Sequence, residues 1–467
     1  MLAMQKNLTN RFYMLLSLPA TAMGFALSVQ ISALSWILTT QYGLDIHEVG
    51  LVWAAGPIAG ILGQVIVGIV SDKVWFWNGR RRPFILVGGV IAGLMLLALP
   101  NIDIVSSSLG FSGILGVAIA IALALDLSIN VSFNPTRSII ADVTPEGEER
   151  TKGYTWMQTV SGTFGVMAYA IGATWGNYAL IYFGAVLVLV LSLIPPFFIE
   201  EPRQLTEQGE VQEDYGLIDV IKNIKPLWGI LIYDIYALGL QISGIKVDHY
   251  YAEAVAGLIT LVLVIQTISA KEQADLPTNQ TGFAKVLAAH SFSWIGVQTM
   301  FVFIIAFLQD KMPSVGDDDL GKIIATSFLI LSITAAFLPA LVLEPVAKKI
   351  GRVKTHTICI ATMAVSYGLV AYIGHEKVNL YILMAILGIG WSSIISLPFA
   401  IMSEKVNQAQ MGLYMGLFNL SVVLPQLLVS LGVGLFISKI ADKSVVFQVS
   451  AVALAISALV WTKVKEK

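Results

Sequence analysis

Long apolar stretches separated by short polar segments follow one another along most of the chain. A helix that crosses a membrane needs about 20 mostly apolar residues, and many windows of this sequence reach that length. The stretches expected to form the principal spans lie at 11–38, 49–71, 83–100, 111–141, 153–174, 178–199, 283–308, 321–347, 355–373, 379–403, 410–438 and 444–462. Two further apolar stretches, 227–245 and 248–270, contain acidic residues and are expected to add a pair of spans. The pattern predicts an all-α membrane protein.

Composition narrows the class further. Of the 467 residues, 56% are hydrophobic and 12% are charged, which is too apolar for a water-soluble protein. The first apolar stretch is too long for a signal-peptide core, so we expect it to be retained as a helix. The single cysteine, Cys359, excludes an intramolecular disulfide. The sequence has no glycine-rich phosphate-binding loop and no HExxH motif, so we expect no cofactor, no metal, no nucleic-acid partner and no enzymatic activity.

Lysines and arginines gather on alternate loops. With the N-terminus placed inside, the inner segments hold twenty-one of them and the outer segments five. Cytoplasmic loops are enriched in these two residues. We therefore expect a multi-pass protein of a bacterial inner membrane or a plasma membrane, surrounded by the lipid bilayer, with both termini in the cytoplasm.

The chain also repeats itself at a distance of 272 residues. This shift places Asp72, Gly79, Arg80 and Arg82 over Glu344, Gly351, Arg352 and Lys354. Two six-helix halves are predicted, and many secondary transporters have parallel halves with a substrate site between them; chance similarity of short basic loops is the alternative. The expected domains are an N-terminal half (1–199), a cytoplasmic linker with a short amphipathic helix (200–226), the extra helix pair (227–270), a second linker (271–282) and a C-terminal half (283–467).

An acidic residue lies midway along the fourth apolar stretch. Asp126, Asn130, Asn134 and Arg137 recur at helical spacing and form one polar stripe, which we expect to face a cavity. A charged side chain at the bilayer centre costs about 3 kcal/mol on insertion, so Asp126 needs a partner or a function. We expect it to load and release a proton in step with a sugar bound beside it; the alternative is a structural carboxylate held by a neighbouring helix. Arg137 lies ~16 Å away along the axis, too far for a direct ion pair.

Polar side chains share helix faces in other spans as well. Amides and flat rings suit a neutral ligand with many hydroxyl groups, whose hydroxyls need hydrogen bonds and whose C–H faces stack on rings; hydrogen bonding between helices is the alternative. The candidates outside the fourth span are Gln30, Gln158, Trp294, Gln298, Trp391, Asn419 and Gln426. His290 is expected either to carry a proton or to act as a neutral donor to a partner or sugar.

Several of these segments resemble one protein family. The stretch GPIAGILGQVIVGIVSDKVWFWNGRRRPFILVGG (56–89) is similar to the second helix, loop and third helix of the sucrose-proton symporter family within the major facilitator superfamily. This family includes plant sucrose transporters and related animal and bacterial sugar transporters. LDLSINVSFNPTRSIIADVTP (125–145) resembles its fourth helix and GLYMGLFNLSVVLPQLLVSLGVG (412–434) its eleventh. The resemblance extends over nearly the whole twelve-helix frame, and the extra pair departs from it.

The resemblance implies a major facilitator fold and proton-coupled uptake of a glucoside, most often a disaccharide such as sucrose or maltose, by alternating access. The charged positions that it matches are Asp126, Arg137 and Glu344. It also implies a cytoplasmic gate in which Asp72 and Arg80 join Asp142, and the residues assigned to this gate are Asp72, Arg80, Arg81, Arg82, Asp142, Glu344 and Arg352. Sodium-coupled or uncoupled sugar transport is one alternative, and a membrane sugar sensor or scaffold is another.

Overall fold

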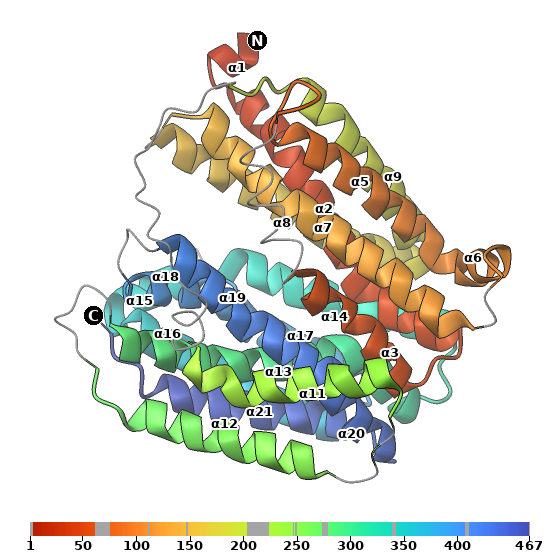
Figure 1. The fold of residues 1–467 in the computed structure, drawn as a ribbon, viewed down its shortest axis with the longest axis vertical. Coiled ribbons are helices and arrows are strands. Elements are labelled where there is room, and N and C mark those ends of the chain that lie inside the picture. Colours follow the sequence, from red (N-terminus) through yellow and green to blue (C-terminus); the bar gives the residue numbers. More distant parts are fainter. Residues whose placement is uncertain are drawn as a thin grey trace. The chain divides into compact units, whose positions relative to one another are not determined.

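A computed structural model of the chain describes residues 3–60, 75–110, 113–145, 148–202, 224–245, 247, 250–272, 279–338, 342–406 and 411–466. Within these ranges the regular structure is helical, apart from one isolated β-bridge between Phe76 and Gly79 (Figure 1). The predicted all-α class is therefore confirmed. Asp72 and most of the expected linker helix at 200–226 lie outside the described residues.

The contacts divide the chain into two units. The first comprises Met1–Gln208 and Ser314–Leu329, and the second comprises Gly209–Pro313 and Ile330–Lys467. Helix α14 (Asp317–Leu338) contributes its first part to one unit and its last part to the other. Within the first unit, Trp36 Nε1 donates a hydrogen bond of 2.7 Å to the backbone oxygen of Asp317, which attaches the start of α14.

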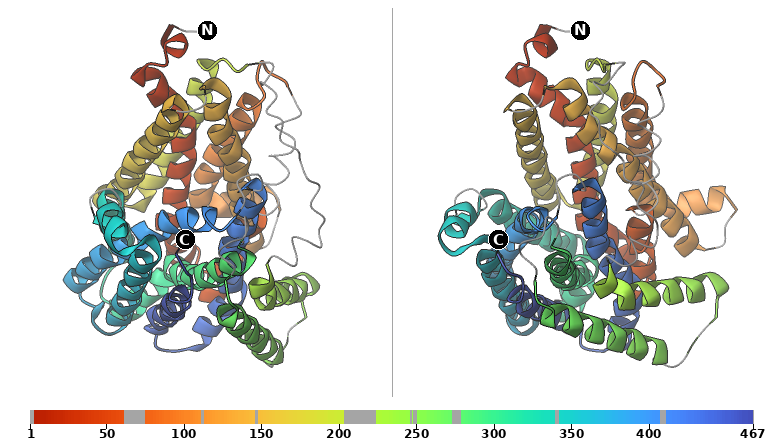
Figure 2. Two further views of the ribbon diagram at one scale, coloured as in Figure 1. Left: turned by 90° about the vertical axis from the view of Figure 1, so that its left-hand side faces the viewer. Right: turned by 60° about the vertical axis from the view of Figure 1, so that its left-hand side comes forward.

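The first unit is a bundle arranged around helix α2. Its helices are α1 (Ala3–Lys6), α2 (Asn10–Thr40), α3 (Ile46–Trp53), α5 (Arg82–Ala98), α6 (Ile102–Ser108), α7 (Ile114–Val143), α8 (Glu148–Trp175) and α9 (Asn177–Phe197). Helix α2 packs against α7, α8 and α9, while α5 packs against both α7 and α9 (Figure 2). This packing places the helix that carries Gln30 beside the helix that carries Asp126.

Small residues let α5 approach its two neighbours closely. A Cβ atom built on Gly88 would overlap Ser132 of α7, and one built on Gly89 would overlap Ser192 of α9. Because lipid tails are as apolar as leucine, helices in membranes associate largely through such close backbone packing. The N-terminal end of α5, which carries the arginine cluster, is thereby positioned within the first unit.

The second unit is built around helix α13. Its helices are α11 (Trp228–Ser243), α12 (Tyr251–Ser269), α13 (Gln280–Lys311), α15 (Glu344–Ile350), α16 (Arg352–Ile373), α17 (Lys377–Ile394), α18 (Leu397–Ser403), α19 (Met411–Leu428), α20 (Gly434–Lys439) and α21 (Val445–Trp461). Helix α13 packs against α19 and α21, and α16 packs against α17 and α21. Two expected spans are irregular. The tenth is interrupted before α18, where Pro398 occupies the first turn, and the eleventh contains a π-helical turn at Val429–Val433.

Ten helices in the described part of the chain are long and apolar enough to cross a membrane. They include α2, α7 and α13, which carry most of the candidate polar residues. Two of the expected spans form shorter helices, because α11 has 16 residues and α21 has 17. The chain is an integral multi-pass membrane protein.

The expected extra stretches form two helices, α11 and α12, which pack against each other within the second unit (Figure 1). Gly229 of α11 packs directly on Thr260 of α12. At the other end of the pair, Lys439 Nζ donates a 2.6 Å hydrogen bond to Tyr250 Oη. Helix α12 exposes a continuous apolar surface that includes Leu258 and Leu261, as expected of a helix surrounded by lipid.

Asp234, for which the sequence assigns no role, lies in α11 and is only 1% exposed. Neither of its carboxylate oxygens has a hydrogen-bond partner among the described residues. Burial of an unpartnered carboxyl group is costly. Asp234 is therefore a buried carboxyl group to which the described residues offer no hydrogen bond.

A buried ionic cluster around Glu272 holds the segment after α12 to the rest of the second unit. The Glu272 carboxylate lies 3.4 Å from Lys285 Nζ and 3.3 Å from Lys405 Nζ, and it accepts a 3.0 Å hydrogen bond from the Lys465 backbone N–H. Both lysines are buried. Burial acts to raise the pKa of Glu272, but the Lys465 N–H and the two ammonium groups outweigh it and hold that pKa below its ordinary value.

We expect the substitution Glu272→Gln to lower the free energy of unfolding at pH 7 by about 3 kcal/mol, because two buried ammonium groups lose their counter-ion. A lowered pKa means that Glu272 stabilises the fold above its unfolded value of ~4.3 and that this contribution disappears as the pH falls through the lower folded value. Thermal unfolding in detergent should therefore show a large difference at pH 7 that narrows below pH ~4.

The control is Glu376→Gln, which removes an exposed carboxylate that precedes α17. It should leave the unfolding temperature unchanged at both pH values. Equal stability of the Glu272→Gln variant and the original chain at pH 7 would contradict the assigned role.

Candidate functional site

The carboxyl group of Asp126 is buried in the first unit and has an amide partner. Gln30 Nε2 of α2 donates a 2.9 Å hydrogen bond to Asp126 Oδ2 of α7, and both residues are at most 5% exposed. A Cβ atom built on Gly56 would lie 3.4 Å from the same oxygen, so the segment after α3 covers the carboxyl group. Among the described residues no lysine or arginine forms an ion pair with Asp126. A carboxyl group in this setting is suited to hold a proton.

Of the polar stripe expected on α7, Asn130 lies next to Asp126. Asn130 Nδ2 donates a 2.8 Å hydrogen bond to the Asp126 backbone oxygen. Arg137 is exposed, and its guanidinium lies 5.0 Å from the centre of the Phe133 ring. As expected from their spacing, Arg137 forms no ion pair with Asp126. Asn134 belongs to α7, but its side chain lies outside the described part, and Gln158 is exposed on α8.

The second unit gathers the candidate aromatic residues into one cluster. The Trp294 ring packs edge-on against Trp391, with 6.0 Å between ring centres, and Trp294 Nε1 donates a 2.9 Å hydrogen bond to His290 Nε2. His290 also stacks on Phe418 at 4.6 Å. Because Nε2 accepts a hydrogen bond, the imidazole ring is neutral in this structure, which favours the donor role over the proton-carrier role.

Two of the candidate amides in the second unit are also brought together. Gln426 Nε2 of α19 donates a 3.2 Å hydrogen bond to Gln298 Oε1 of α13. Asn419 is half-buried on α19, one residue after Phe418. Each unit therefore has buried hydrogen-bonding groups on transmembrane helices, and the cluster of Trp294, Trp391 and His290 lies in the second unit.

The arginine cluster makes different contacts from those expected. Arg81, not Arg80, forms the ion pair with Asp142, at 3.0 Å from Nε to Oδ2. Arg82 donates to the backbone oxygen of Ile199. The reason is the turn at the start of α5: the backbone amides of all three arginines are fixed on one carboxylate, and this orientation directs the second arginine toward α7.

The corresponding loop of the second unit carries Arg352, which forms an exposed ion pair with Glu404. The side chain of Glu344, at the start of α15, lies outside the described part of the chain, as does Asp72 in the first unit. The gate roles of Glu344 and Asp72 therefore stay predictions. A gate needs contacts that form and break easily, and an exposed pair such as Arg352 and Glu404 has that property.

Sequence reasoning missed two glutamates that anchor these loops. Glu201 accepts hydrogen bonds of 2.7–2.8 Å from the backbone N–H groups of Arg80, Arg81 and Arg82. Glu466 accepts in the same way from the N–H groups of Arg352 and Val353. A carboxylate at a helix N-terminus satisfies amides that have no partner inside the helix. The signal in the sequence was an acidic residue soon after the last span of each half.

The two glutamates also explain the glycines of the repeat. A Cβ atom built on Gly79 would overlap Glu201, and one built on Gly351 would overlap Glu466. Gly351 in addition has φ +94°, a conformation that favours glycine. The same arrangement therefore occurs in each unit. A glycine leaves room for a glutamate, and this glutamate binds the N-terminus of the following helix.

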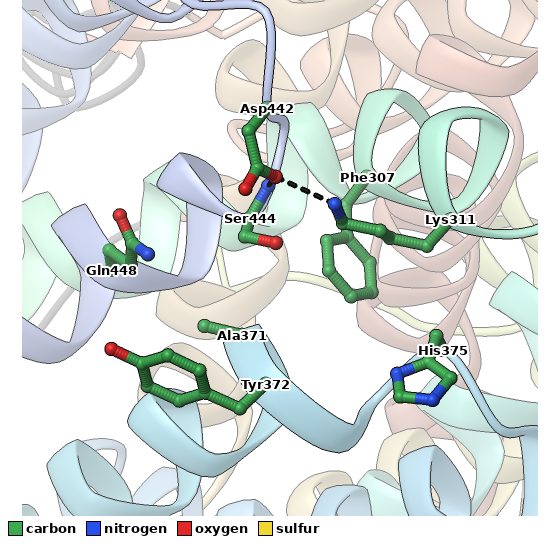
Figure 3. Close-up of a pocket in the computed structure, with 8 residues that line it drawn as sticks. All are labelled: Phe307, Lys311, Ala371, Tyr372, His375, Asp442, Ser444 and Gln448. Atoms are coloured by element: carbon green, nitrogen blue, oxygen red, sulfur yellow. Dashed lines mark hydrogen bonds and ion pairs between the residues drawn. The ribbon is translucent and has the colours of Figure 1, made fainter.

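A separate small pocket lies at the ends of α13 and α16 and the start of α21 (Figure 3). It has a volume of about 200 Å³ and contains none of the candidate sugar-binding residues. Lys311 Nζ lies 2.7 Å from Asp442 Oδ1 at its edge. Hydrogen bonds from Lys311 and from the Ser444 N–H lower the pKa of Asp442 to about 2, so this carboxylate stays ionised at physiological pH.

We expect the substitution Glu201→Gln to increase hydrogen–deuterium exchange at the amides of Arg80, Arg81 and Arg82 about tenfold, because it removes the charge from an acceptor of three hydrogen bonds. Exchange measured by mass spectrometry on peptides from the start of α5 checks this. Glu466→Gln is the matched control. It should raise exchange at Arg352 and Val353 and leave the start of α5 unchanged, whereas equal exchange in all variants would exclude the anchoring role.

Comparison with known proteins places the chain among transporters. A family model described as the Major Facilitator Superfamily matches residues 16–424. The sucrose transport proteins SUC4 and SUC3 of Arabidopsis thaliana are 23% and 24% identical to it, each over 89% of this chain and over 82% and 80% of their own lengths. The general alpha-glucoside permease of Schizosaccharomyces pombe is 28% identical over 33% of this chain and 31% of its own length.

Solved structures agree on the fold. A mutant of the nucleoside transporter NupG has a TM-score of 0.69 at 13% identity, covering 97% of this chain and 100% of its own. The POT family transporter PepTSo has a TM-score of 0.68 at 12% identity, covering 97% of both chains. At these identities the similarity concerns the fold alone.

Proposed function

The chain belongs to the Major Facilitator Superfamily, and from this membership we propose that it takes up a glucoside sugar together with a proton by alternating access. A glucoside is the proposed substrate because the similar proteins include sucrose transport proteins and an alpha-glucoside permease. The proposed substrate is a disaccharide such as sucrose or maltose. The solute and the proton are the partners that this function requires, in a lipid bilayer.

Proton coupling is supported by the geometry of Asp126. Its Oδ2 atom accepts the hydrogen bond from Gln30, and no basic side chain among the described residues forms an ion pair with it. A protonated carboxyl group crosses between conformations without a net charge, whereas the ionised form is costly inside the membrane. Loading Asp126 with a proton would therefore favour the reorientation that carries the sugar.

Sugar binding is supported by the neighbouring hydrogen-bonding and aromatic groups. Asn130 lies one turn from Asp126 on α7, so a sugar that bonds to its amide would sense the protonation state of the carboxyl group. Trp294 and Trp391 supply flat surfaces in the second unit, and neutral His290 can hydrogen-bond without carrying charge. These groups match a ligand with hydroxyl groups and no charge.

We expect Asp126→Asn to abolish proton-driven accumulation of sugar and to retain at least half of the counterflow exchange, because asparagine keeps a polar group of the same size and cannot take up a proton. The measurement uses proteoliposomes and labelled sucrose, maltose and glucose, with and without an inward proton gradient. The variant Asp103→Asn, which removes an exposed carboxylate on α6, is the control and should retain both activities.

The outcomes separate the two parts of the proposal. Accumulation by Asp126→Asn at the original level would exclude Asp126 as the coupling group. Counterflow with none of the sugars would exclude sugar transport, and accumulation that depends on sodium in place of the proton gradient would establish sodium coupling. Specific sugar binding without flux would instead favour a sensor.

A further inference from the structure

An apolar groove runs along the outside of the first unit between α5 and α9. Its volume is about 430 Å³. It is lined by Leu86, Val87, Val90 and Ile91 on α5, by Leu193 and Phe197 on α9, and by Trp77 in the turn before α5. Its walls hold no charged side chain. The groove begins at the end of α5 that carries the arginine cluster and extends along the helix into the membrane.

The turn that holds Trp77 has an unusual backbone. Phe76 and Gly79 form an antiparallel bridge, and the two residues between them, Trp77 and Asn78, have φ angles of 48° and 57°. Such a turn normally takes asparagine or glycine at both positions, and a bulky residue with positive φ is rare. Trp77 is nevertheless held there with 61% of its surface exposed and its ring against the groove. Tryptophan is enriched where the hydrocarbon core meets the headgroups.

Positive charge lies directly after this turn. Arg81 is neutralised by Asp142, and Arg82 is bound to the Ile199 backbone oxygen. The carboxylate of Glu201 is occupied by three backbone amides. The Arg80 guanidinium, by contrast, forms no hydrogen bond or ion pair in the part of the chain that the structure describes. A guanidinium without an ion-pair partner among the described residues can bind a phosphate there.

We propose that this groove binds one acyl chain of an anionic phospholipid, whose phosphate is bound by Arg80. The groove supplies the apolar surface for the chain, Trp77 covers it at the level of the headgroup, and Arg80 supplies the charge that selects an anionic lipid over a zwitterionic one. All three features come from residues 76–91 and the facing end of α9, so the site is complete within the first unit. It is separate from the groups assigned to sugar and proton.

The test is lipid binding by native mass spectrometry on the full chain in detergent. Phosphatidylglycerol is titrated against phosphatidylethanolamine with the same acyl chains. We expect the first phosphatidylglycerol to bind at least tenfold more tightly, and Arg80→Ala to remove this preference. Val90→Phe fills the groove and should weaken both lipids at least fivefold. Glycerol 3-phosphate at millimolar concentration should not displace the lipid, because it offers no acyl chain.

The control is Arg11→Ala, which removes an exposed arginine at the same expected side of the membrane and should leave the preference intact. Elution of each variant as a single species in gel filtration verifies folding, and Arg80→Gln repeats the charge removal with a polar side chain. Equal binding of both lipids to the original chain, or a preference that survives in both Arg80 variants, would overturn the proposal. Unchanged binding in Val90→Phe would exclude the groove as the site.

Discussion

A carboxyl group in the middle of a transmembrane helix is the constraint around which the first unit is organised. Lipid cannot solvate Asp126, so its helix has to be packed where another side chain can reach it. Gln30 provides this contact, and it can do so because α2 packs against α7. An amide partner satisfies the carboxyl group without fixing its charge, which a lysine or arginine would do. The hydrogen bond that Asp126 requires and the proton exchange proposed for it therefore involve the same pair of residues.

At the ends of the helices, in contrast, carboxylates are held by backbone N–H groups. Glu201 and Glu466 each bind the amides at the start of a helix, and a glycine leaves the room for each of them. Both units therefore use a glutamate beside a glycine to bind backbone amides at the start of a helix. These glutamates fix the backbone, and the arginine side chains next to it make different contacts in the two units. Arg81 pairs with Asp142 in the first unit, and Arg352 pairs with Glu404 in the second.

The extra helices α11 and α12 are attached to the second unit by a small set of contacts. Helix α12 exposes apolar side chains that suit lipid, and the buried cluster around Glu272 binds the following segment to Lys285, Lys405 and the C-terminal backbone. The segment after the pair is thus held by ionic contacts, and within the second unit Tyr233 of α11 packs on Gly432 in the π-helical turn. Asp234 is the exception, since it is buried and has no hydrogen-bond partner among the residues that the structure describes.

Helical class, the approximate spans and the importance of Asp126 were available from the sequence, because hydrophobic runs and the cost of a buried charge are properties of local stretches of chain. The family resemblance and the repeat likewise followed from contiguous motifs. Only the tertiary structure decided which groups meet. Gln30 and Asp126 are 96 positions apart, and Arg81 and Glu201 are 120 positions apart. The choice of Arg81 over Arg80 for Asp142 depended on how a distant glutamate orients the backbone of the turn. Local patterns determine which residues need partners, but the partners themselves are chosen by helix packing, which brings together segments that no sequence window contains.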